Sequence, residues 1–433
     1  MKIEEGSPFA RRIAAFLRKD FRPRYGDREA VTDSNAIWEK VSALRSELWL
    51  DSGDAEAVSD IWTREFSALT TNNTLLNREI QKGTYDGFVQ EAAALLAEGP
   101  DLDERERMLE LAFMLNARHG LSLVERFDAY VSVEEHTDLA HDMAGALAYA
   151  RRFHAVCPER FIVKMPFTPA GLLATRQAGA DGIAVNLTLG FSARQNYVAA
   201  AIARPSFVNV FLGRLNSFVA DNGLGDGAYV GEKATLASQA AVRELRSEKN
   251  LRTRQIAASL RDGGQVRDLA GVDVLTMPPK VARGFLELGL RAEDVEDRTP
   301  EVYEPGINQA AREIGVSSLW NLDDPLRQCV AALQEEDLDA FSPSALQAFL
   351  SGHGFEDLLP DWTDEQVALS RGEGKIPQIV NWSERLAERR IGVDSLMTLA
   401  GLNSFTADQA EMDDRVESLL TPAGGARPQA NAA

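Results

Sequence analysis

The sequence has few of the features that mark several protein classes. Its 433 residues include two cysteines, Cys157 and Cys329, too few for a disulfide framework or a zinc cluster. No apolar run approaches the ~18 residues that a membrane-spanning helix needs. Residues 1–26 are charged and mixed, without the apolar segment of a secretory signal. We therefore expect a cytoplasmic protein that does not bind membranes.

The chain also has fewer basic than acidic residues. The chain has 46 Lys+Arg against 66 Asp+Glu, a formal net charge of −20. Nucleic acids are bound by basic surfaces that neutralise their phosphates, so nucleic acid is an unfavourable partner for this chain. The hydrophobic share of 45% and the charged share of 26% are typical of globular proteins. The length predicts one large domain with additions, or two domains.

Between residues 46 and 290 the sequence alternates short β-rich apolar runs with amphipathic, helix-like segments. The predicted strands are 48–50, 68–70, 129–133, 161–165, 182–187, 207–211, 255–258 and 272–276. Strands that alternate with helices favour parallel pairing. Eight such units in about 240 residues are close to the size of a (β/α)8 barrel. The predicted fold class is therefore α/β, with a (β/α)8 TIM barrel as the catalytic domain at 46–290.

The flanking segments have a different character. Residues 1–45 show apolar positions at helical spacing and predict a helical N-terminal extension. Residues 291–420 are rich in Leu, Ala, Glu and Asp, with prolines that mark the starts and stops of short helices. The last predicted helix covers about 406–420. The Pro-, Gly- and Ala-rich residues 421–433 predict a disordered tail.

The chemistry of a TIM barrel lies at the carboxyl ends of its strands. The polar side chains there, together with the aromatic residue at the end of the sixth strand, are therefore the candidate site residues. They are Asp51, Thr70, Asn72, Glu134, Lys164, Asn186, Thr188, Asn209, Phe211, Arg214, Ser259 and Arg261.

Lys164 is the most informative of these residues, because it lies within the apolar run 161–165. Removing water from an amine favours its neutral form. A neutral amine in a polar barrel mouth is what carbonyl addition and Schiff-base formation require. The alternative is a structural ion pair of Lys164 with Asp51 or Glu134.

The other charged candidates also allow two interpretations. Asp51 and Glu134 come from different strands and suit separate proton transfers, but they could simply cap the following helices. Arg214 and Arg261 leave neighbouring strands and could form a fork for one phosphate, or pair with surface acids.

The segment 134–142 contains several residue types that ligate metals. Its two histidines, His136 and His141, are five residues apart and do not share a helix face. Acidic residues are expected in the first turn of the helix that follows. We predict no metal site and no cofactor.

Eight stretches, in order, resemble the transaldolase family of Schiff-base class I aldolases of the pentose phosphate pathway. They are LWLDSGD (48–54), LTTNNTLL (69–76), VSVEEHTDLAHD (131–142), FIVKMPFTPAGL (161–172), VNLTLGFSARQ (185–195), FVNVFLGRL (207–215), QIAASLR (255–261) and VDVLTMPP (272–279). The resemblance implies that Lys164 forms the Schiff base with the ketose C2 carbonyl. It also implies that Asp51 deprotonates the C4 hydroxyl, and that Glu134 and Thr188 hold a proton-shuttling water.

The remaining candidates receive binding roles from the same resemblance. Asn72, Asn186 and Thr70 would contact the dihydroxyacetone unit, and Arg214, Arg261 and Ser259 would bind phosphate. The related fructose-6-phosphate aldolases carry Tyr at the position of Phe211, so Phe favours transfer over simple aldol cleavage.

The sequence departs from the family pattern at both ends of the expected substrate. Asn73 replaces a proline, which predicts a less fixed turn after the second strand. Asn209 and Val210 replace Ser and Pro, and Asn209 retains the ability to donate a hydrogen bond to phosphate. Residues 401–420 resemble the helix that closes many transaldolases, although an ordinary amphipathic helix fits nearly as well. Residues 300–400 would then be an insertion near the barrel mouth, as a lid or a subunit contact.

The leading hypothesis is a transaldolase that uses sugar phosphates and needs no cofactor. It would transfer a dihydroxyacetone unit from sedoheptulose 7-phosphate or fructose 6-phosphate to an aldose phosphate. One alternative is a Schiff-base aldolase or transferase acting on an unusual sugar, and another is a catalytically idle barrel that binds a partner protein. The oligomeric state stays open, a homo-oligomer included. Phosphorylated substrates further predict a locally positive mouth on the acidic molecule.

Overall fold

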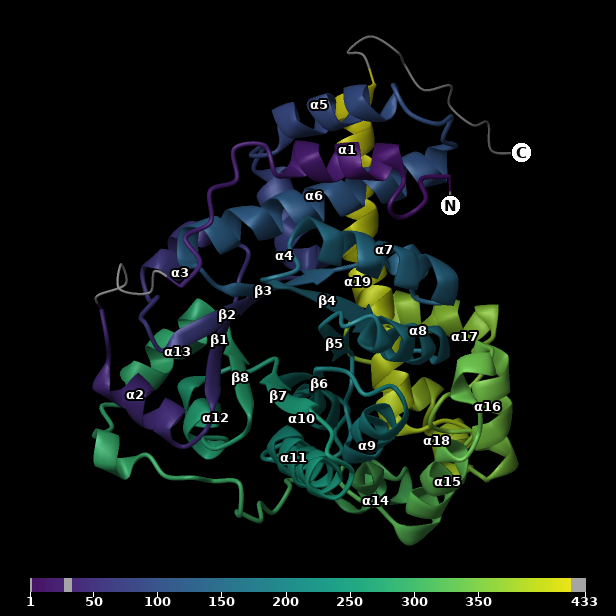
Figure 1. The fold of residues 1–433 in the computed structure, drawn as a ribbon. Helices are drawn as coiled ribbons and strands as arrows, with labels where there is room; N and C mark the ends of the chain where they lie inside the picture. Colours follow the sequence, from purple (N-terminus) through teal and green to yellow (C-terminus); the bar gives the residue numbers. More distant parts are fainter. Residues whose placement is uncertain (1, 27–32, 422–433) are drawn as a thin grey trace.

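Eight parallel strands close into a barrel in which each strand pairs with its neighbours in the sequence and β8 pairs with β1. The computed structural model describes residues 2–26 and 33–421 (Figure 1). The strands are β1 Glu47–Asp51, β2 Phe66–Thr70, β3 Tyr130–Glu134, β4 Phe161–Pro166, β5 Val185–Thr188, β6 Phe207–Phe211, β7 Arg254–Ala258 and β8 Val274–Met277. The predicted (β/α)8 barrel is confirmed, with every strand within a few residues of its predicted position.

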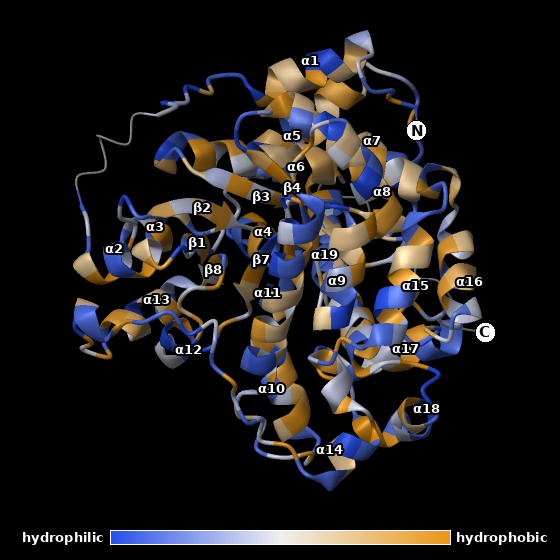
Figure 2. Cartoon of the chain, turned by 60° about the horizontal axis from the view of Figure 1, so that its bottom comes forward, coloured by the Kyte–Doolittle hydropathy of each residue, from blue (hydrophilic) through white to orange (hydrophobic). Residues whose placement is uncertain are grey.

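Helices connect the strands and surround the barrel. They are α3 Ala55–Ser59, α4 Asn73–Gln81, α5 Asp86–Leu96, α6 Glu104–Phe127, α7 Met143–Val156, α8 Pro169–Ala180, α9 Ala193–Ile202, α10 Leu212–Asp221, α11 Val230–Lys249, α12 Gly263–Asp268 and α13 Pro279–Leu286. In Figure 2, hydrophobic and hydrophilic residues alternate along α1 and α11, as expected of helices with one buried face.

Further helices lie before β1 and after β8. Before β1 are α1 Pro8–Leu17 and α2 Ala36–Ala43. After β8 come α14 Gln309–Glu313, α15 Asp324–Gln334, α16 Pro343–Gly352, α17 Asp364–Glu373, α18 Ser383–Ala387 and α19 Val393–Leu420. Short 3₁₀ turns lie at Thr137–Leu139, Ala292–Asp294, Val316–Leu319, Leu338–Ala340 and Ile379–Asn381. The domain limits at 45/46 and 290/291 stay a prediction, and the expected tail beyond Thr421 lies outside the described residues.

Polar residues directly after the strands begin many of the barrel helices. The side chains of Asp54, Asn72, Thr168, Ser192 and Asp262 accept hydrogen bonds from backbone N–H groups in the first turns of α3, α4, α8, α9 and α12. These caps satisfy N–H groups that have no partner within the helix. The barrel mouth is thus surrounded by short, well-defined turns.

Apolar side chains fill the barrel interior below its carboxyl end. Trp49, Ile162, Ile256 and Val274 are buried there, and the Trp49 ring lies 4.8 Å from that of Phe207. At the opposite end Glu47 accepts hydrogen bonds from Trp49 Nε1 (3.1 Å) and Ser67 Oγ (2.5 Å), and it pairs with Arg254. The interior is a packed core, so the space for a substrate is at the carboxyl end of the strands.

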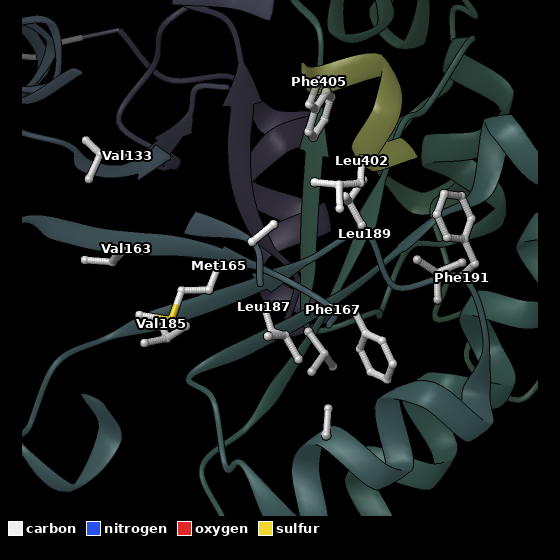
Figure 3. Close-up of a cluster of buried hydrophobic side chains, with 14 of the residues drawn as sticks. Val133, Val163, Met165, Phe167, Val185, Leu187, Leu189, Phe191, Leu402 and Phe405 are labelled. Atoms are coloured by element: carbon white, nitrogen blue, oxygen red, sulfur yellow. The ribbon is translucent and has the colours of Figure 1, made fainter. Parts of the chain in front are cut away.

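Helix α19 is longer than the sequence predicted. It begins at Val393, not near residue 406, and has 28 residues. Its first half is buried on all sides, so it lacks the alternation of polar and apolar residues that marks a surface helix. Figure 1 shows α19 running past β3, β4 and β5 between α18 and α5. In Figure 3, Leu402 of this helix lies beside Leu189, which follows β5.

Several polar contacts attach α19 to the barrel loops. Near its start Asp394 pairs with Arg194 of α9 (2.7 Å), and Thr398 Oγ1 donates to the Leu189 carbonyl (2.9 Å). Near its end Asn77 Nδ2 donates to Glu411 Oε2 (3.0 Å). One helix therefore joins α4, which follows β2, to the loop and helix α9 that follow β5. Within residues 2–26 and 33–421, no helix is both long and apolar enough to cross a membrane.

Candidate active site

A cavity of about 490 Å³ opens at the carboxyl ends of the strands. It brings together every predicted site residue except Glu134. The predicted residues that line it are Asp51, Thr70, Asn72, Lys164, Asn186, Thr188, Asn209, Phe211, Arg214, Ser259 and Arg261. A larger hollow of about 1120 Å³ lies between α6 and the end of α19, but its wall is rich in carboxylates, which suits an anionic substrate poorly.

Strand register places the central residues side by side. Glu134 pairs with Lys164 across β3 and β4, and Lys164 pairs with Asn186 across β4 and β5. Paired residues of parallel neighbours project to the same side of the sheet, here the barrel interior. Asp51 and Thr70 pair in the same way across β1 and β2, and Thr70 Oγ1 donates to Asp51 Oδ1 (2.7 Å).

The Lys164 amine is buried and makes no ion pair within the described part of the chain. Its side chain is 4% exposed, and Nζ donates to the backbone carbonyl of Thr71 (2.6 Å). The alternative of a structural ion pair with Asp51 or Glu134 is therefore not formed. The amine faces the cavity, where a carbonyl carbon can reach it.

Glu134 lies buried beside Lys164 and accepts a hydrogen bond from the Asn73 backbone N–H at Oε2 (3.0 Å). Burial raises the pKa of Glu134, and the charges of Asp51 and Asp408 add to this effect. The nearby Lys164 and the Asn73 hydrogen bond oppose it. A carboxyl group in these surroundings can hold or release a proton close to the amine.

The turn after β2 is held by hydrogen bonds of Asn73, so the expectation that this turn is less fixed is wrong. Asn73 is fully buried at the start of α4, its N–H binds Glu134, and its Nδ2 donates to the Glu135 carbonyl (3.3 Å). Proline has no N–H and could not make the first of these bonds. The substitution therefore fixes the turn by hydrogen bonds instead of by a locked φ angle.

A small amide network positions Asn186. Its Nδ2 donates to Ser132 Oγ (3.2 Å), and its Oδ1 accepts from Asn209 Nδ2 (3.1 Å). Asn209 Nδ2 also donates to the Leu187 carbonyl (3.0 Å). Both amide hydrogens of Asn209 are thus engaged, which favours a positioning role over the predicted donation to phosphate. Oγ1 of Thr188 is buried without a hydrogen-bond partner among the described residues and lies on the cavity wall.

Arg214 sits in the first turn of α10 and packs against two neighbouring aromatic rings. Its guanidinium carbon lies 5.6 Å from the ring centres of Phe211 and of Phe405 on α19. Burial and the positive charge of Arg261 lower the pKa of Arg214 to about 10, so it remains charged near neutral pH. Its Nη1 is buried and has no hydrogen-bond partner in the described ranges. An anion entering the cavity would supply one.

The start of α10 packs directly on the end of β7. A Cβ on Gly213 would lie 2.2 Å from the Ser259 carbonyl oxygen, so only glycine fits there. Ser259 itself has a φ of +63°, a backbone state that non-glycine residues seldom adopt. This close approach brings Arg214, Ser259 and the exposed Arg261 to one side of the cavity.

Four further cations line the cavity: Arg78, Lys280, Arg283 and Lys375. Asp51 is the one carboxylate in its wall among the described residues. The expected positive mouth on an acidic molecule is therefore present. Lys280 lies three residues after β8, in the first turn of α13, so inspection of the residues after each predicted strand could have identified it. Lys375 lies on the C-terminal region, and no motif in the sequence pointed to it.

Thr276 and two residues of α19 also belong to the site. Thr276 Oγ1 lies 2.8 Å from Thr70 Oγ1, Phe405 forms part of the wall, and Asp408 hydrogen-bonds Thr74. The resemblance of residues 401–420 to a closing helix was the signal for Phe405 and Asp408. One of the two histidines of segment 134–142 is engaged elsewhere: His136 Nε2 lies 3.0 Å from Asp413 Oδ2, and its Nδ1 accepts from the Asp138 N–H (3.0 Å).

The family profile described as Transaldolase/Fructose-6-phosphate aldolase matches residues 48–350 of the chain. The chain belongs to this family. The match covers the whole barrel and reaches into the helices that follow β8, so the family fold includes every strand that contributes to the cavity.

Named relatives agree with this assignment. A transaldolase of Xanthomonas euvesicatoria pv. vesicatoria is 29% identical over 248 residues, which cover 55% of this chain and 76% of the relative. A transaldolase of Xanthomonas oryzae pv. oryzae is 31% identical over 249 residues, with the same shares. A probable transaldolase of Thermus thermophilus is 32% identical over 245 residues, which cover 56% of this chain and 91% of the relative.

Proposed function

We propose that the protein is a transaldolase that transfers a dihydroxyacetone unit from a ketose phosphate to an aldose phosphate. Sedoheptulose 7-phosphate and fructose 6-phosphate are the proposed donors. The observation that supports this most directly is Lys164, a buried amine with no carboxylate partner in the described chain, which faces a cavity with a cationic rim.

The first half of the reaction uses Lys164, Glu134 and Asp51. The neutral amine adds to the C2 carbonyl, and loss of water from the carbinolamine gives a protonated imine. Glu134 is placed to exchange the protons of these steps, together with Thr188, whose hydroxyl lacks a partner in the described chain. Asp51 then takes the C4 hydroxyl proton, the C3–C4 bond breaks, and its electron pair moves to the imine to give an enamine.

The second half reverses the order with a different aldehyde. The enamine carbon adds to the acceptor aldehyde, Asp51 returns its proton to the new hydroxyl, and water releases the product ketose from Lys164. Arg214, Ser259 and Arg261, on one side of the cavity, are proposed to hold the phosphate of donor and acceptor. Asn186 and Thr70, beside Lys164 and Asp51, are proposed to bind the hydroxyls of the dihydroxyacetone unit.

Borohydride trapping with fructose 6-phosphate, followed by peptide mass spectrometry, tests the proposal. We expect a reduced dihydroxyacetone adduct on Lys164 and none in Lys164→Met. Lys280→Ala, which removes another lysine of the same cavity, should still be trapped. No adduct with any ketose phosphate in a panel, in folded protein, would overturn the proposal and favour an idle barrel. An adduct with a ketose other than fructose 6-phosphate and sedoheptulose 7-phosphate, and none with these two, would support the unusual-sugar alternative.

A further inference from the structure

Four of the cations that line the cavity have no partner for their charged groups. Within residues 2–26 and 33–421, the side chains of Arg78, Arg261, Lys280 and Lys375 make no ion pair and no hydrogen bond. The molecule has twenty more acidic than basic residues, yet Asp51 is the one carboxylate in the described wall of this cavity. Unpaired cations gathered around one cavity indicate an anionic ligand.

Lys375 differs from the other three because it does not belong to the barrel. It lies in the loop between α17 and the 3₁₀ turn Ile379–Asn381, in the region that follows β8. This loop is attached to the far end of α10, the helix that carries Arg214. Asn222, the residue after α10, donates from Nδ2 to the Pro377 carbonyl (2.9 Å) and accepts at Oδ1 from the Ile379 N–H (2.7 Å).

The acidic neighbour of Lys375 is held away from it. Glu373 accepts hydrogen bonds from Trp382 Nε1 (2.8 Å), Asn381 Nδ2 (2.6 Å) and the Gln378 N–H (3.1 Å). Gly374, between the two charged residues, has a φ of +78°, a backbone state that glycine adopts readily. The chain therefore turns at Gly374, and Lys375 reaches the cavity wall while Glu373 is engaged elsewhere.

We propose that Lys375 is a specificity-determining residue that binds the phosphate of the sugar at the end remote from Lys164. It adds a cation from the region after β8 to the two that Arg214 and Arg261 supply. The inference rests on the proposed function for the identity of the ligand as a sugar phosphate. A dianionic phosphate then gains a charge-assisted contact that an unphosphorylated sugar of the same length does not.

The role of Lys375 can be tested independently of the proposed reaction by measuring the binding of a probe that cannot react. Glucitol 6-phosphate carries the phosphate but has no carbonyl group, so it cannot form a Schiff base with Lys164. We expect calorimetric titration to show that Lys375→Ala weakens its binding roughly threefold to tenfold, while Lys375→Arg stays within about twofold. The weak binding of unphosphorylated glucitol should not change.

Two further variants control for position and for charge. Lys249→Ala removes an exposed lysine with no ion pair at the far end of α11 and should leave binding unchanged. Asn222→Ala keeps Lys375 but removes its anchor, and it should weaken the probe about as much as Lys375→Ala. Thermal melts are expected to show that the Lys375 and Lys249 variants are folded, because both lysines are exposed, and the same melts check that Asn222→Ala is folded.

Each outcome decides between the two proposals. Unchanged binding of glucitol 6-phosphate by Lys375→Ala, or no binding by the unmodified protein, would overturn the inference. Normal probe binding that depends on Lys375, without any trapped adduct on Lys164, would leave the inference standing and remove the proposed transaldolase reaction.

Discussion

Two consecutive acidic residues at the end of β3 have different surroundings. Glu134 faces the interior beside Lys164 and accepts a hydrogen bond from Asn73. Glu135 is buried, with only 4% of its surface exposed. Neither of its carboxylate oxygens has a hydrogen-bond partner in the described chain. Burial, with Glu134 and Asp142 nearby, raises the pKa of Glu135 well above its usual range. Glu134 takes part in the proposed reaction, whereas the ionised form of Glu135 lowers the free energy of unfolding because it is buried without a partner.

Glu135→Gln should therefore stabilise the protein in a pH-dependent way. Below the unfolded-state pKa of about 4.3 the carboxyl is protonated in both states, and the variant should match the parent. Above that pH the unfolded chain ionises Glu135 more readily than the folded protein does, so parent stability falls as pH rises toward the raised folded pKa. We expect the variant to melt roughly 2 °C higher at pH 8 and equally at pH 4.

Exposed Glu91, which makes no ion pair among the described residues, is the control. Glu91→Gln should show no such dependence on pH. A Glu135→Gln variant that melts at the same temperature as the parent at pH 8 would mean that the carboxylate finds a partner when it ionises.

At the scale of elements, α19 completes the site that the barrel begins. Its Phe405 ring is one of the two that flank the Arg214 guanidinium, and Figure 3 shows Phe405 and Leu402 on the same helix segment close to Leu189. A side chain at Gly401 would lie 2.7 Å from Leu189 Cδ2. The helix therefore packs closely enough to hold Arg214 in one orientation.

Phe405→Ala should impair binding of phosphorylated sugars more than the chemistry at Lys164. Without the ring, Arg214 loses a cation–π contact of about 1 kcal/mol and gains freedom to move. We expect the KM for fructose 6-phosphate to rise roughly tenfold, with kcat for the same donor changed less than threefold. Phe349→Ala, which removes a ring on α16 that stacks on His353, should leave both constants unchanged. Equal losses in kcat and kcat/KM would place Phe405 in the chemical step instead.

The same elements show what could be predicted from the sequence. Strands β1 to β8 are buried on both faces and rich in apolar and β-branched residues, so short apolar runs located them. Lys164 was conspicuous because it interrupts one of these runs. The first half of α19 was missed because it is buried all round, and periodicity marks only helices with one polar face. The prediction that Asn209 binds substrate rests on its ability to donate a hydrogen bond, whereas its contacts with Asn186 and Leu187 depend on tertiary structure and could not be predicted.

At the scale of the whole molecule, the region after β8 is joined to the barrel by buried charges. Arg194 of α9 pairs with Asp394 at the start of α19 and with Asp357 (2.7 Å to each). Ser192 Oγ also donates to Asp394 (2.5 Å), whose side chain is fully buried. The start of α9, the segment around Asp357 and the start of α19 therefore meet at one buried cluster of charged residues. Sequence could not reveal it, because Arg194 lies more than 150 positions before both of its acidic partners and charged residues are common throughout the chain.

Asp394→Asn should lower the free energy of unfolding and let the region after β8 unfold separately from the barrel. Removing one partner of a buried ion pair typically costs about 3 to 5 kcal/mol, because the remaining charge stays buried. We expect urea unfolding to begin at lower concentration, with tryptophan fluorescence changing before far-ultraviolet circular dichroism, since Trp362 and Trp382 pack together in the region after β8. Asp357→Asn should cost less, because Asp357 is the more exposed acid. A single transition in all three proteins, with equal midpoints, would contradict this expectation.

The position of α19 also bears on how the protein is made. Strand β8 ends at Met277, whereas α19 begins at Val393 and contributes Phe405 to the cavity. During synthesis the ribosome releases the barrel strands well before this helix, so Lys164 can be inside a closed barrel while one wall of its cavity is still absent. In a nascent chain at that stage, the Lys164 amine would be less protected from water. The interval ends only when translation has passed the helix, and ribosome pausing between residues 277 and 393 would prolong it.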